Sequence, residues 1–180
     1  MKTIICSVAL FSLLFMGAVH ANEQAPFGNQ VSAVKNYNRA TSQIATSGVI
    51  GDGAQALAKH GFKTIIDLRT EAEGTQEEKL AVEAAGLRYV NIPVTGAGIN
   101  AEQLAAFTKV IEATQTPVLV HCASGNRAGA LWATYRMSKG VAPEIALEEG
   151  RTAGMSGAME TNVKMAIGDS AGYLCGDVPC

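Results

Sequence analysis

The stretch VLVHCASGNRAGALW, Val118–Trp132, decides the fold expected for this chain. An apolar run ends in His121 and Cys122, a loop of small and polar residues follows, and the run after Arg127 has a helical composition. A thiol and a guanidinium therefore stand at the two ends of a short loop between a strand and a helix. In open α/β sheets, ligands bind beyond the carboxyl ends of the strands, which is where this loop is expected.

Strands and helices are predicted to alternate on both sides of this loop. Apolar runs predict strands at 62–68, 87–94 and 116–120. Helices are predicted before Gly61, over 75–86 with a Thr75–Glu78 capping box, over 100–113 with Asn100 as N-cap, over 127–140, and from Pro143 to about Asp169. Short connections between such elements predict an α/β fold, with a mostly parallel central sheet flanked by helices.

The 180 residues are enough for one domain. We expect a signal peptide at 1–21, an irregular N-terminal lead at 22–38, the domain at 39–170 and a tail at 171–180. Lys2, the apolar run Ile4–Val19 and a small residue at Ala21 are typical of a cleavable secretory signal. The alternative is an uncleaved anchor, but the apolar run is short for a membrane span. The mature protein is thus expected to be periplasmic or secreted, without stable membrane association.

The expected export determines how the cysteines are interpreted. Signal cleavage removes Cys6, and the closely spaced Cys175 and Cys180 are expected to form a disulfide in an oxidising compartment. Cys122 is then unpaired, and it is either a reactive thiol or a buried structural one. The choice between the two depends on its neighbours.

Charge and histidine content narrow the function classes. The net charge is −2 and no Lys/Arg-rich run occurs, so no nucleic-acid partner is expected. The mature chain keeps only His60 and His121, and its potential ligands are not clustered in sequence. No metal or other cofactor is expected, and the sequence does not indicate an oligomeric state.

The loop has the composition of an oxyanion site. Unpaired N–H groups at a helix N-terminus bind anions, small residues allow close approach, and Arg127 adds a forked contact. The same features stabilise a thiolate at Cys122. We expect Cys122 to be the nucleophile, with Asp67, which ends a strand at the same sheet edge, as a further catalytic candidate. The oxyanion is expected to bind at Ala123, Ser124, Gly125, Asn126, Arg127 and Ala128.

Together with GFKTIIDLRTEAE and GLRYVNIPV, this loop and the following ALWA resemble the cysteine-dependent phosphatase superfamily. The sequence is most similar to the bacterial phosphatase-like domain found fused to beta-lactamase-like hydrolases, also described as a sulfurtransferase family. The resemblance runs from about Arg39 to Met137. It implies a phosphatase-like α/β fold, Cys122 as nucleophile, Arg127 as anion binder and His121 as a residue that orients the loop.

Three departures from the phosphatase pattern keep the chemistry open. Four residues separate Cys122 from Arg127 instead of five, a spacing also seen in rhodanese-like loops. Ala128 stands where many phosphatases have Ser or Thr, a role that Ser124 is able to take. No Asp or Glu occurs between Arg88 and Ala101, where the phosphatases carry a general acid worth about 10²–10⁴-fold in rate.

Candidate replacements for the acid are Asp67, Glu71 and Glu102, although Glu71 and Glu73 are expected to lie further out than Asp67 and Arg69. The alternative for Asp67 is that it pins neighbouring loops together with Arg69. The leading hypothesis is a phosphatase that acts on phosphomonoesters through a cysteinyl-phosphate. A sulfurtransferase with a Cys122 persulfide and a non-catalytic oxyanion-binding module are the alternatives.

Overall fold

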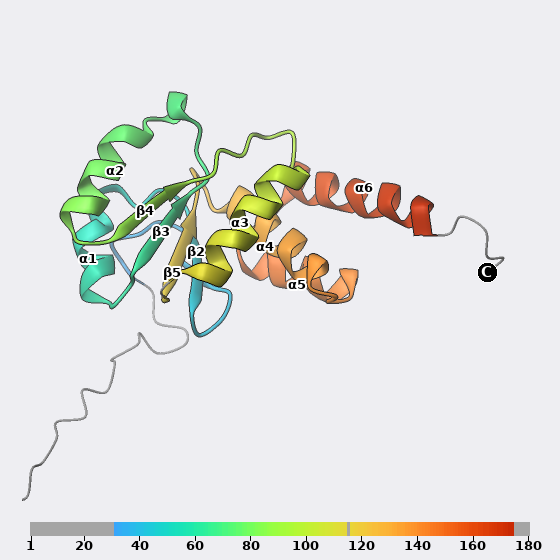
Figure 1. The fold of residues 1–180 in the computed structure, drawn as a ribbon, viewed down its shortest axis with the longest axis horizontal. Helices are drawn as coiled ribbons and strands as arrows, with labels where there is room; N and C mark the ends of the chain where they lie inside the picture. The colour runs from blue at the N-terminus through green and yellow to red at the C-terminus, as the bar shows by residue number, and fades with distance from the viewer. Residues whose placement is uncertain (1–30, 115, 175–180) are drawn as a thin grey trace, which may run out of the picture.

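The structure, a computed structural model, describes residues 31–114 and 116–174, with side chains described as far as residue 168 (Figure 1). The predicted signal peptide at 1–21, most of the predicted lead, and Cys175 and Cys180 lie outside the described residues.

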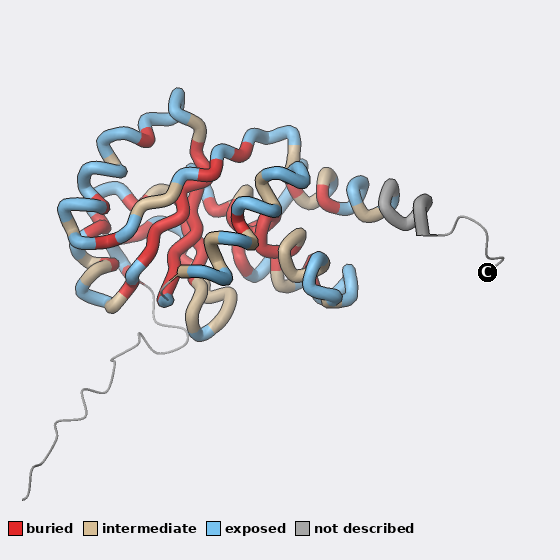
Figure 2. The backbone as a smooth tube through the Cα atoms, viewed as in Figure 1, coloured by how far each residue is buried: buried red, intermediate tan, exposed pale blue. Residues whose placement is uncertain are grey.

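The centre of the domain is a five-stranded sheet with the order β1-β2-β5-β3-β4. Its four parallel strands are β2 (Ile44–Ser47), β5 (Val118–His121), β3 (Thr64–Asp67) and β4 (Arg88–Asn91). The two-residue β1 (Asn38–Arg39) pairs antiparallel with β2 at the edge. The central strands β3 and β5 are buried throughout (Figure 2). The mostly parallel sheet flanked by helices confirms the predicted fold class.

Helices cover both faces of the sheet. They are α1 (Ala54–Lys59) and α2 (Thr75–Ala84) on one face, and α3 (Ala101–Ala113) and α4 (Asn126–Ser138) on the other. Asn100 caps α3 as predicted, because its side chain accepts a hydrogen bond from the Gln103 amide. Short 3₁₀ turns, η1 (Gly51–Gly53) and η2 (Glu71–Glu73), precede α1 and α2.

Side-chain alternation along β5 decides which residues meet at the site. Leu119 packs in the apolar layer beneath α1 and α2. Val118 and Val120 pack in the layer beneath α3 and α4, and Cys122 continues that layer. Since successive side chains of a strand point to opposite faces, His121 faces the α1 and α2 side. Cys122 and His121 therefore belong to different layers of the domain.

The chain after α4 forms two helices where the sequence predicted one. They are α5 (Pro143–Thr152) and α6 (Gly157–Leu174), and both pack against α4 (Figure 1). The predicted single helix is interrupted at Gly154, whose φ of +105° suits glycine alone, and the Met155 amide bonds back to the Gly150 carbonyl at 2.8 Å. This bend brings the α5–α6 connection against the start of α4.

The N-terminal side of the domain also differs from expectation. No strand was predicted at β2, although it is a parallel neighbour of β5. Within the predicted lead, Val31, Val34 and Tyr37 are buried in the core beneath α1. The described part of the lead before Asn38 is irregular, as predicted, yet it is packed against the domain.

The capping box predicted for α2 was wrong. Gly74 precedes α2, and Thr75 is its first helical residue without a side-chain cap. The reciprocal pair lies one turn earlier, where Glu73 Oε2 accepts hydrogen bonds from the Thr70 amide (2.9 Å) and hydroxyl (3.0 Å). Glu78 is thus available for other contacts.

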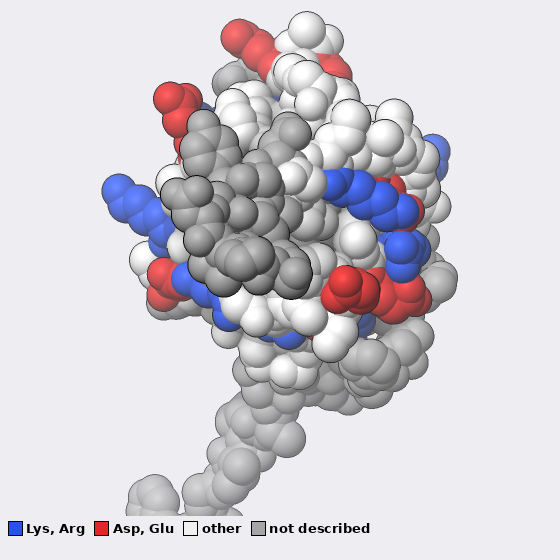
Figure 3. Space-filling model, turned by 90° about the vertical axis from the view of Figure 1, so that its right-hand side faces the viewer, with Lys and Arg blue, Asp and Glu red and all other residues white. Residues whose placement is uncertain are grey.

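The described surface mixes charges of both signs. In the view of Figure 3, basic and acidic side chains lie beside one another and do not gather into a field of one sign. Among the ion pairs of α5 and α6, Glu160 contacts both Arg151 and Lys164. Among the described helices, none is long and apolar enough to cross a membrane.

Candidate active site

Cys122 lies directly after β5, at the bottom of a tight loop that leads into α4. Gly125 precedes α4 with a φ of +95°, a left-handed conformation that allows the chain to turn sharply into the helix. This turn aims the Gly125 amide back at the thiol, and its N–H donates to Cys122 Sγ at 3.2 Å. Cys122 has no exposed surface. The thiol is therefore enclosed by its loop and by the apolar layer that contains Val120 and Ala128.

Neighbouring segments hold the loop from its outer side. The Val49 amide donates to the Ala123 carbonyl at 3.2 Å, and Gly48 forms a bridge with Ser124. The Asn36 amide group donates to the Ser124 carbonyl at 3.0 Å. These contacts fix the loop backbone independently of the residues that face a substrate.

The first turn of α4 is fixed as well. Asn126 Oδ1 accepts a hydrogen bond from the Ser156 amide at 2.8 Å, which ties the helix start to the α5–α6 connection. Ala128 is fully buried. The first N–H groups of a helix have no intrahelical partners, so this fixed turn presents donors at the loop.

Arg127 reaches from α4 to the segments that follow β3 and β4. Its Nη1 donates to Glu73 Oε2 at 2.9 Å and to the Val94 carbonyl at 2.8 Å, with the Leu68 carbonyl at 3.5 Å. Its Nη2 donates to Glu73 Oε1 at 2.5 Å. Hydrogen bonding to Glu73 raises the pKa of the Arg127 guanidinium, and the nearby Cys122 adds to the effect. The cation is thus held beside the loop by one carboxylate and two carbonyls.

Glu73 is a site residue that the sequence placed too far out. The hydrogen bonds from Arg127, assisted by those from Thr70, lower the pKa of the Glu73 carboxyl to about 2 despite its partial burial. Glu73 is therefore ionised at neutral pH. The Thr70-x-x-Glu73 pattern was a local signal that this carboxylate is held in place.

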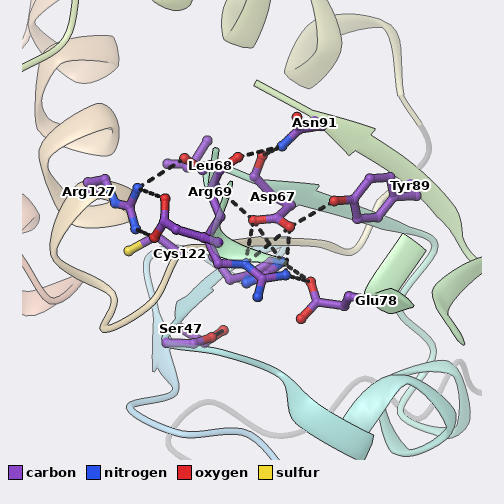
Figure 4. A network of polar contacts seen from close by, with 12 residues as sticks. Ser47, Asp67, Leu68, Arg69, Glu78, Tyr89, Asn91, Cys122 and Arg127 are labelled. Carbon is purple, nitrogen blue, oxygen red and sulfur yellow. Dashed lines mark hydrogen bonds and ion pairs between the residues drawn. The ribbon is translucent and has the colours of Figure 1, made fainter. Parts of the chain in front are cut away.

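Asp67 belongs to a buried polar network (Figure 4). His121 is a further member, through its contacts with Asp67 and Glu78. Arg69 donates through Nε to Asp67 Oδ1 at 3.0 Å and through Nη2 to Oδ2 at 2.8 Å. The Tyr89 hydroxyl donates to Asp67 Oδ2 at 2.8 Å. Glu78 Oε1 lies 2.7 Å from Arg69 Nη2 and 2.8 Å from His121 Nε2. The network ties β3, β4, β5 and α2 together at the sheet edge that carries the loop.

This placement changes the expected role of Asp67. In the parallel register Asp67 is the partner of His121, not of Cys122, and it shares the α1 and α2 side with His121. Burial alone would raise the pKa of Asp67, but the hydrogen bonds from Arg69 and the electrostatic interaction with His121 lower it on balance. The Asp67 carboxylate is thus fully buried and paired with Arg69 and Tyr89, and it does not lie above the sulfur (Figure 4).

The ligand atoms of Asp67, Glu78 and His121 lie within 4.8 Å of one another, as in many metal sites. The guanidinium of Arg69, however, contacts both carboxylates. A metal cation in this cluster would meet that positive charge in a buried setting. The residues present therefore fit an ion-pair network better than a metal site.

The remaining acid candidates, Glu71 and Glu102, lie on exposed parts of the described chain. Glu71 is exposed in η2, and Glu102 is exposed in the first turn of α3. Among the described residues, Glu73 is the carboxylate that bonds to Arg127, and it is paired there.

Curated relatives match part of the chain. The beta-lactamase hydrolase-like protein of Xylella fastidiosa is 39% identical over 89 residues, which are 47% of this chain and 21% of the relative. The protein of the same name from Agrobacterium fabrum is 36% identical over 107 residues, 57% of this chain and 24% of the relative. The chain thus spans about a fifth to a quarter of the length of these relatives.

Solved phosphatase-family structures share the fold. A DUF442 phosphatase-family protein from Shewanella putrefaciens has a TM-score of 0.64 at 22% identity, over 78% of this chain and 92% of that chain. A phosphatase-family protein from Neisseria meningitidis has a TM-score of 0.63 at 24% identity, over 72% and 96%. At such identities the likeness concerns the fold alone.

A family match covers most of the chain. Residues 29–166 match the family described as "DSP-PTPase phosphatase fused to NAD+ Kinase". The matched region contains the whole sheet, the Cys122 loop and the Glu73–Arg127 pair. As the resemblance predicted, the chain belongs to this family of DSP-PTPase phosphatases, within the cysteine-dependent tyrosine and dual-specificity phosphatase superfamily.

Proposed function

We propose that the protein is a cysteine-dependent phosphatase that hydrolyses phosphomonoesters through a cysteinyl-phosphate. The observation that carries the proposal is the hydrogen bond of 3.2 Å from the Gly125 amide to Cys122 Sγ, in a loop that ends at Arg127. An N–H donor aimed at sulfur stabilises a thiolate more than a thiol, and so does a neighbouring guanidinium. The loop therefore holds a nucleophile and oxyanion donors together.

In the first step, the Cys122 thiolate attacks phosphorus, the S–P bond forms and the P–O ester bond breaks. The leaving oxygen departs with the bonding electrons and takes a proton from water. Loop N–H groups and Arg127 hold the phosphoryl oxygens, on which negative charge builds in the transition state. Glu73 keeps the guanidinium in place, and its pairing with Arg127 leaves the second Nη2 hydrogen and the Nε hydrogen for the substrate.

In the second step, water attacks phosphorus, the S–P bond breaks and the thiolate leaves with its electron pair. Inorganic phosphate is released after the attacking water loses a proton to solvent. Ala128 has no hydroxyl to assist the departing thiolate, and Ser124 is the hydroxyl residue within the loop. The Gly125 N–H supplies one stabilising contact to the thiolate as it leaves.

The test is phosphate release from p-nitrophenyl phosphate by the purified mature protein. We expect turnover that is lost in Cys122→Ser and strongly reduced in Arg127→Ala, with partial recovery in Arg127→Lys. Arg151→Ala, which removes an arginine from an exposed ion pair, is the matched control and should retain full activity. Activity that survives Cys122→Ser would overturn the proposal.

A parallel assay with thiosulfate and cyanide separates this proposal from sulfur transfer. Thiocyanate formation without phosphate release would identify a sulfurtransferase. Vanadate or phosphate binding without turnover of either substrate would identify an oxyanion-binding module. In either case the phosphatase proposal fails.

We further propose that the mature chain is exported and carries a Cys175–Cys180 disulfide, on the sequence grounds given above. The mass of the protein from a periplasmic or medium fraction should correspond to cleavage after Ala21. Thiol titration of the unfolded, non-reduced chain should find one free thiol per molecule, that of Cys122. Three free thiols in the exported chain would contradict the disulfide.

A further inference from the structure

The peptide group between Ser124 and Gly125 in the nucleophile loop is held at both ends. Its carbonyl oxygen accepts a hydrogen bond from the Asn36 side-chain amide at 3.0 Å, and its N–H donates to Cys122 Sγ at 3.2 Å. The C=O and N–H bonds of a planar trans peptide point in opposite directions. The contact with Asn36 on one side of the loop therefore fixes the direction of the N–H on the other side, where the sulfur lies.

This peptide group has an alternative orientation that the contact with Asn36 disfavours. A flip exchanges the positions of its C=O and N–H by rotation about Ser124 ψ and Gly125 φ. Gly125 has a φ of +95°, and glycine adopts either sign of φ at little cost. After a flip, the Ser124 carbonyl oxygen would face Cys122 Sγ in place of an N–H donor. A carbonyl oxygen there would repel both a thiolate and the oxygens of a phosphoryl group.

Asn36 is itself fixed by its surroundings in an unusual backbone conformation. Its φ is +49°, and among the residues that the structure describes it is the one non-glycine residue with a positive φ. The buried Val34 and Tyr37 anchor the chain on either side of it, and the Asn38 side chain donates to the Asn36 carbonyl at 3.1 Å. Such conformations persist only where the surrounding structure enforces them, and they cluster at functional sites.

The segment that carries Asn36 lies close to the loop through Gly48. The Gly48 amide donates to the Lys35 carbonyl at 2.8 Å, and Gly48 forms a bridge with Ser124. A Cβ at Gly48 would lie 3.1 Å from the Ala123 carbonyl oxygen and 3.3 Å from the Lys35 carbonyl oxygen, so the three segments approach closely. This packing keeps the Asn36 amide within hydrogen-bond distance of the loop.

We propose that Asn36 is a positioning residue of the active site, which holds the Ser124–Gly125 peptide in the orientation that directs the Gly125 N–H at Cys122 Sγ and at a bound oxyanion. The inference rests on the proposed phosphatase function and adds a residue that lies 88 positions before Ser124 in the sequence.

Loss of the Asn36 amide should leave a folded protein in which a fraction of the molecules has the flipped peptide. Only the unflipped fraction binds an oxyanion well, so the apparent affinity falls in proportion to that fraction. A bound substrate restores the active orientation, because the phosphoryl oxygens favour the N–H donor over the carbonyl oxygen. KM should therefore rise while kcat changes little.

The test compares two variants of the mature protein with wild type. Asn36→Gly suits the left-handed backbone and removes the donor. Asn36→Asp keeps the shape but replaces the donor with an acceptor, to which the flipped Gly125 N–H would donate. We expect KM for p-nitrophenyl phosphate and Kd for inorganic phosphate to rise by about 3- to 10-fold in Asn36→Gly, the factor that one hydrogen bond contributes, and by more in Asn36→Asp. Gln55→Glu introduces the same charge at an exposed position of α1 and should keep the wild-type constants.

The NMR amide resonance of Gly125 gives a second readout. In wild type, inorganic phosphate should shift this resonance, because the N–H donates to the anion. In Asn36→Asp the resonance should differ before phosphate is added, and its shift should require a higher phosphate concentration. If Asn36 only stabilised the fold, the folded variant would show the wild-type resonance and the wild-type Kd.

The outcomes separate the inference from the function on which it rests. Cys122-dependent hydrolysis with unchanged KM and phosphate Kd in both folded Asn36 variants would overturn the inference and leave the phosphatase standing. Weaker phosphate binding in both variants, with no hydrolysis by wild type, would overturn the function and support the positioning role in an oxyanion-binding loop. A wild-type protein that neither hydrolyses p-nitrophenyl phosphate nor binds phosphate would overturn both.

Discussion

The Glu73 carboxylate binds both terminal nitrogens of Arg127, at 2.9 and 2.5 Å, across 54 residues of sequence. The two residues come from different elements, since Glu73 ends η2 and Arg127 lies in the first turn of α4. Two backbone carbonyls complete the grip on the guanidinium. An arginine held in this way has already lost its side-chain freedom before the oxyanion binds. Its contacts with the oxyanion can therefore stabilise the transition state without a further entropy cost.

Removal of the Glu73 charge should weaken the enzyme without unfolding it. In Glu73→Gln, Arg127 loses its ionic partner, and we expect kcat/KM for p-nitrophenyl phosphate to fall by about 10²-fold at most, the scale of a small misplacement. Vanadate affinity should fall in parallel. If Glu73 only stabilised the fold, the affinity of the folded variant for vanadate would not change. Glu71→Gln alters an exposed neighbour in the same turn and should retain full activity. Equal activity of the two variants would show that Arg127 needs no such support.

The same ion pair predicts how stability depends on pH. The pKa of Glu73 is about 2 in the folded protein and lies near its usual 4.5 when the chain unfolds, so the folded state binds fewer protons. The contribution of the pair is therefore present above about pH 4.5 and is lost as the pH falls through about 2. Urea unfolding should find wild type more stable than Glu73→Gln by about 1 kcal/mol or less at neutral pH, because the pair is partly exposed. A difference that persists below pH 2 would contradict this assignment.

The dependence of kcat/KM on the leaving group should show that the site lacks a general acid. An enzyme with a positioned general acid protonates the leaving oxygen and depends little on its basicity, whereas this site has no unpaired carboxylate in contact with Arg127 among the described residues. We expect kcat/KM to fall by about 10²-fold or more from p-nitrophenyl phosphate to phenyl phosphate. Single-turnover kinetics should confirm that the chemical step is being compared. Equal rates for the two esters would show that an acid is present.

Local sequence signals predicted those helix starts and ends that are determined by residues close in sequence. The helix after Asn100 begins with an N-cap, and Gly61 and Gly86 end their helices in a left-handed conformation. In contrast, β2 is only four residues long and owes its formation to pairing with β5, which no local pattern records. The bend at Gly154 likewise depends on the contact with α4.

The loop residues of the site were predictable because they are contiguous. Glu73 was placed too far out, since its contact with Arg127 depends on how two distant segments meet. The orientation of Asp67 was within reach of the sequence. Strand alternation puts Cys122 and His121 on opposite faces, and a register that pairs Asp67 with His121 places Asp67 with the latter.

Disruption of the buried Asp67–Arg69 network should lower the stability of the fold. In Asp67→Ala, the buried Arg69 guanidinium loses its bidentate partner, and we expect the free energy of unfolding to fall by about 3–5 kcal/mol. Asp67→Asn keeps acceptor and shape, so the loss should be smaller. Denaturant unfolding measures both values. If Asp67→Ala were as stable as wild type, the network would not be what fixes this edge of the sheet.

Close packing of α4 against the α5–α6 connection predicts opposite effects for two Gly→Ala substitutions. A Cβ at Gly129 would lie 2.3 Å from the Met155 backbone nitrogen and 2.6 Å from the Gly150 carbonyl oxygen, so backbone must move. We expect Gly129→Ala to lower the free energy of unfolding by about 1–3 kcal/mol or more. Gly168 in α6 is exposed with open space around it, and Gly168→Ala should raise that free energy by up to about 1 kcal/mol through helix propensity. Thermal unfolding of the two variants measures both changes in stability. Because Gly129 adjoins the Arg127 turn, Gly129→Ala should also lower the activity of the folded protein. A neutral Gly129→Ala would mean that α4 and the α5–α6 connection do not approach this closely.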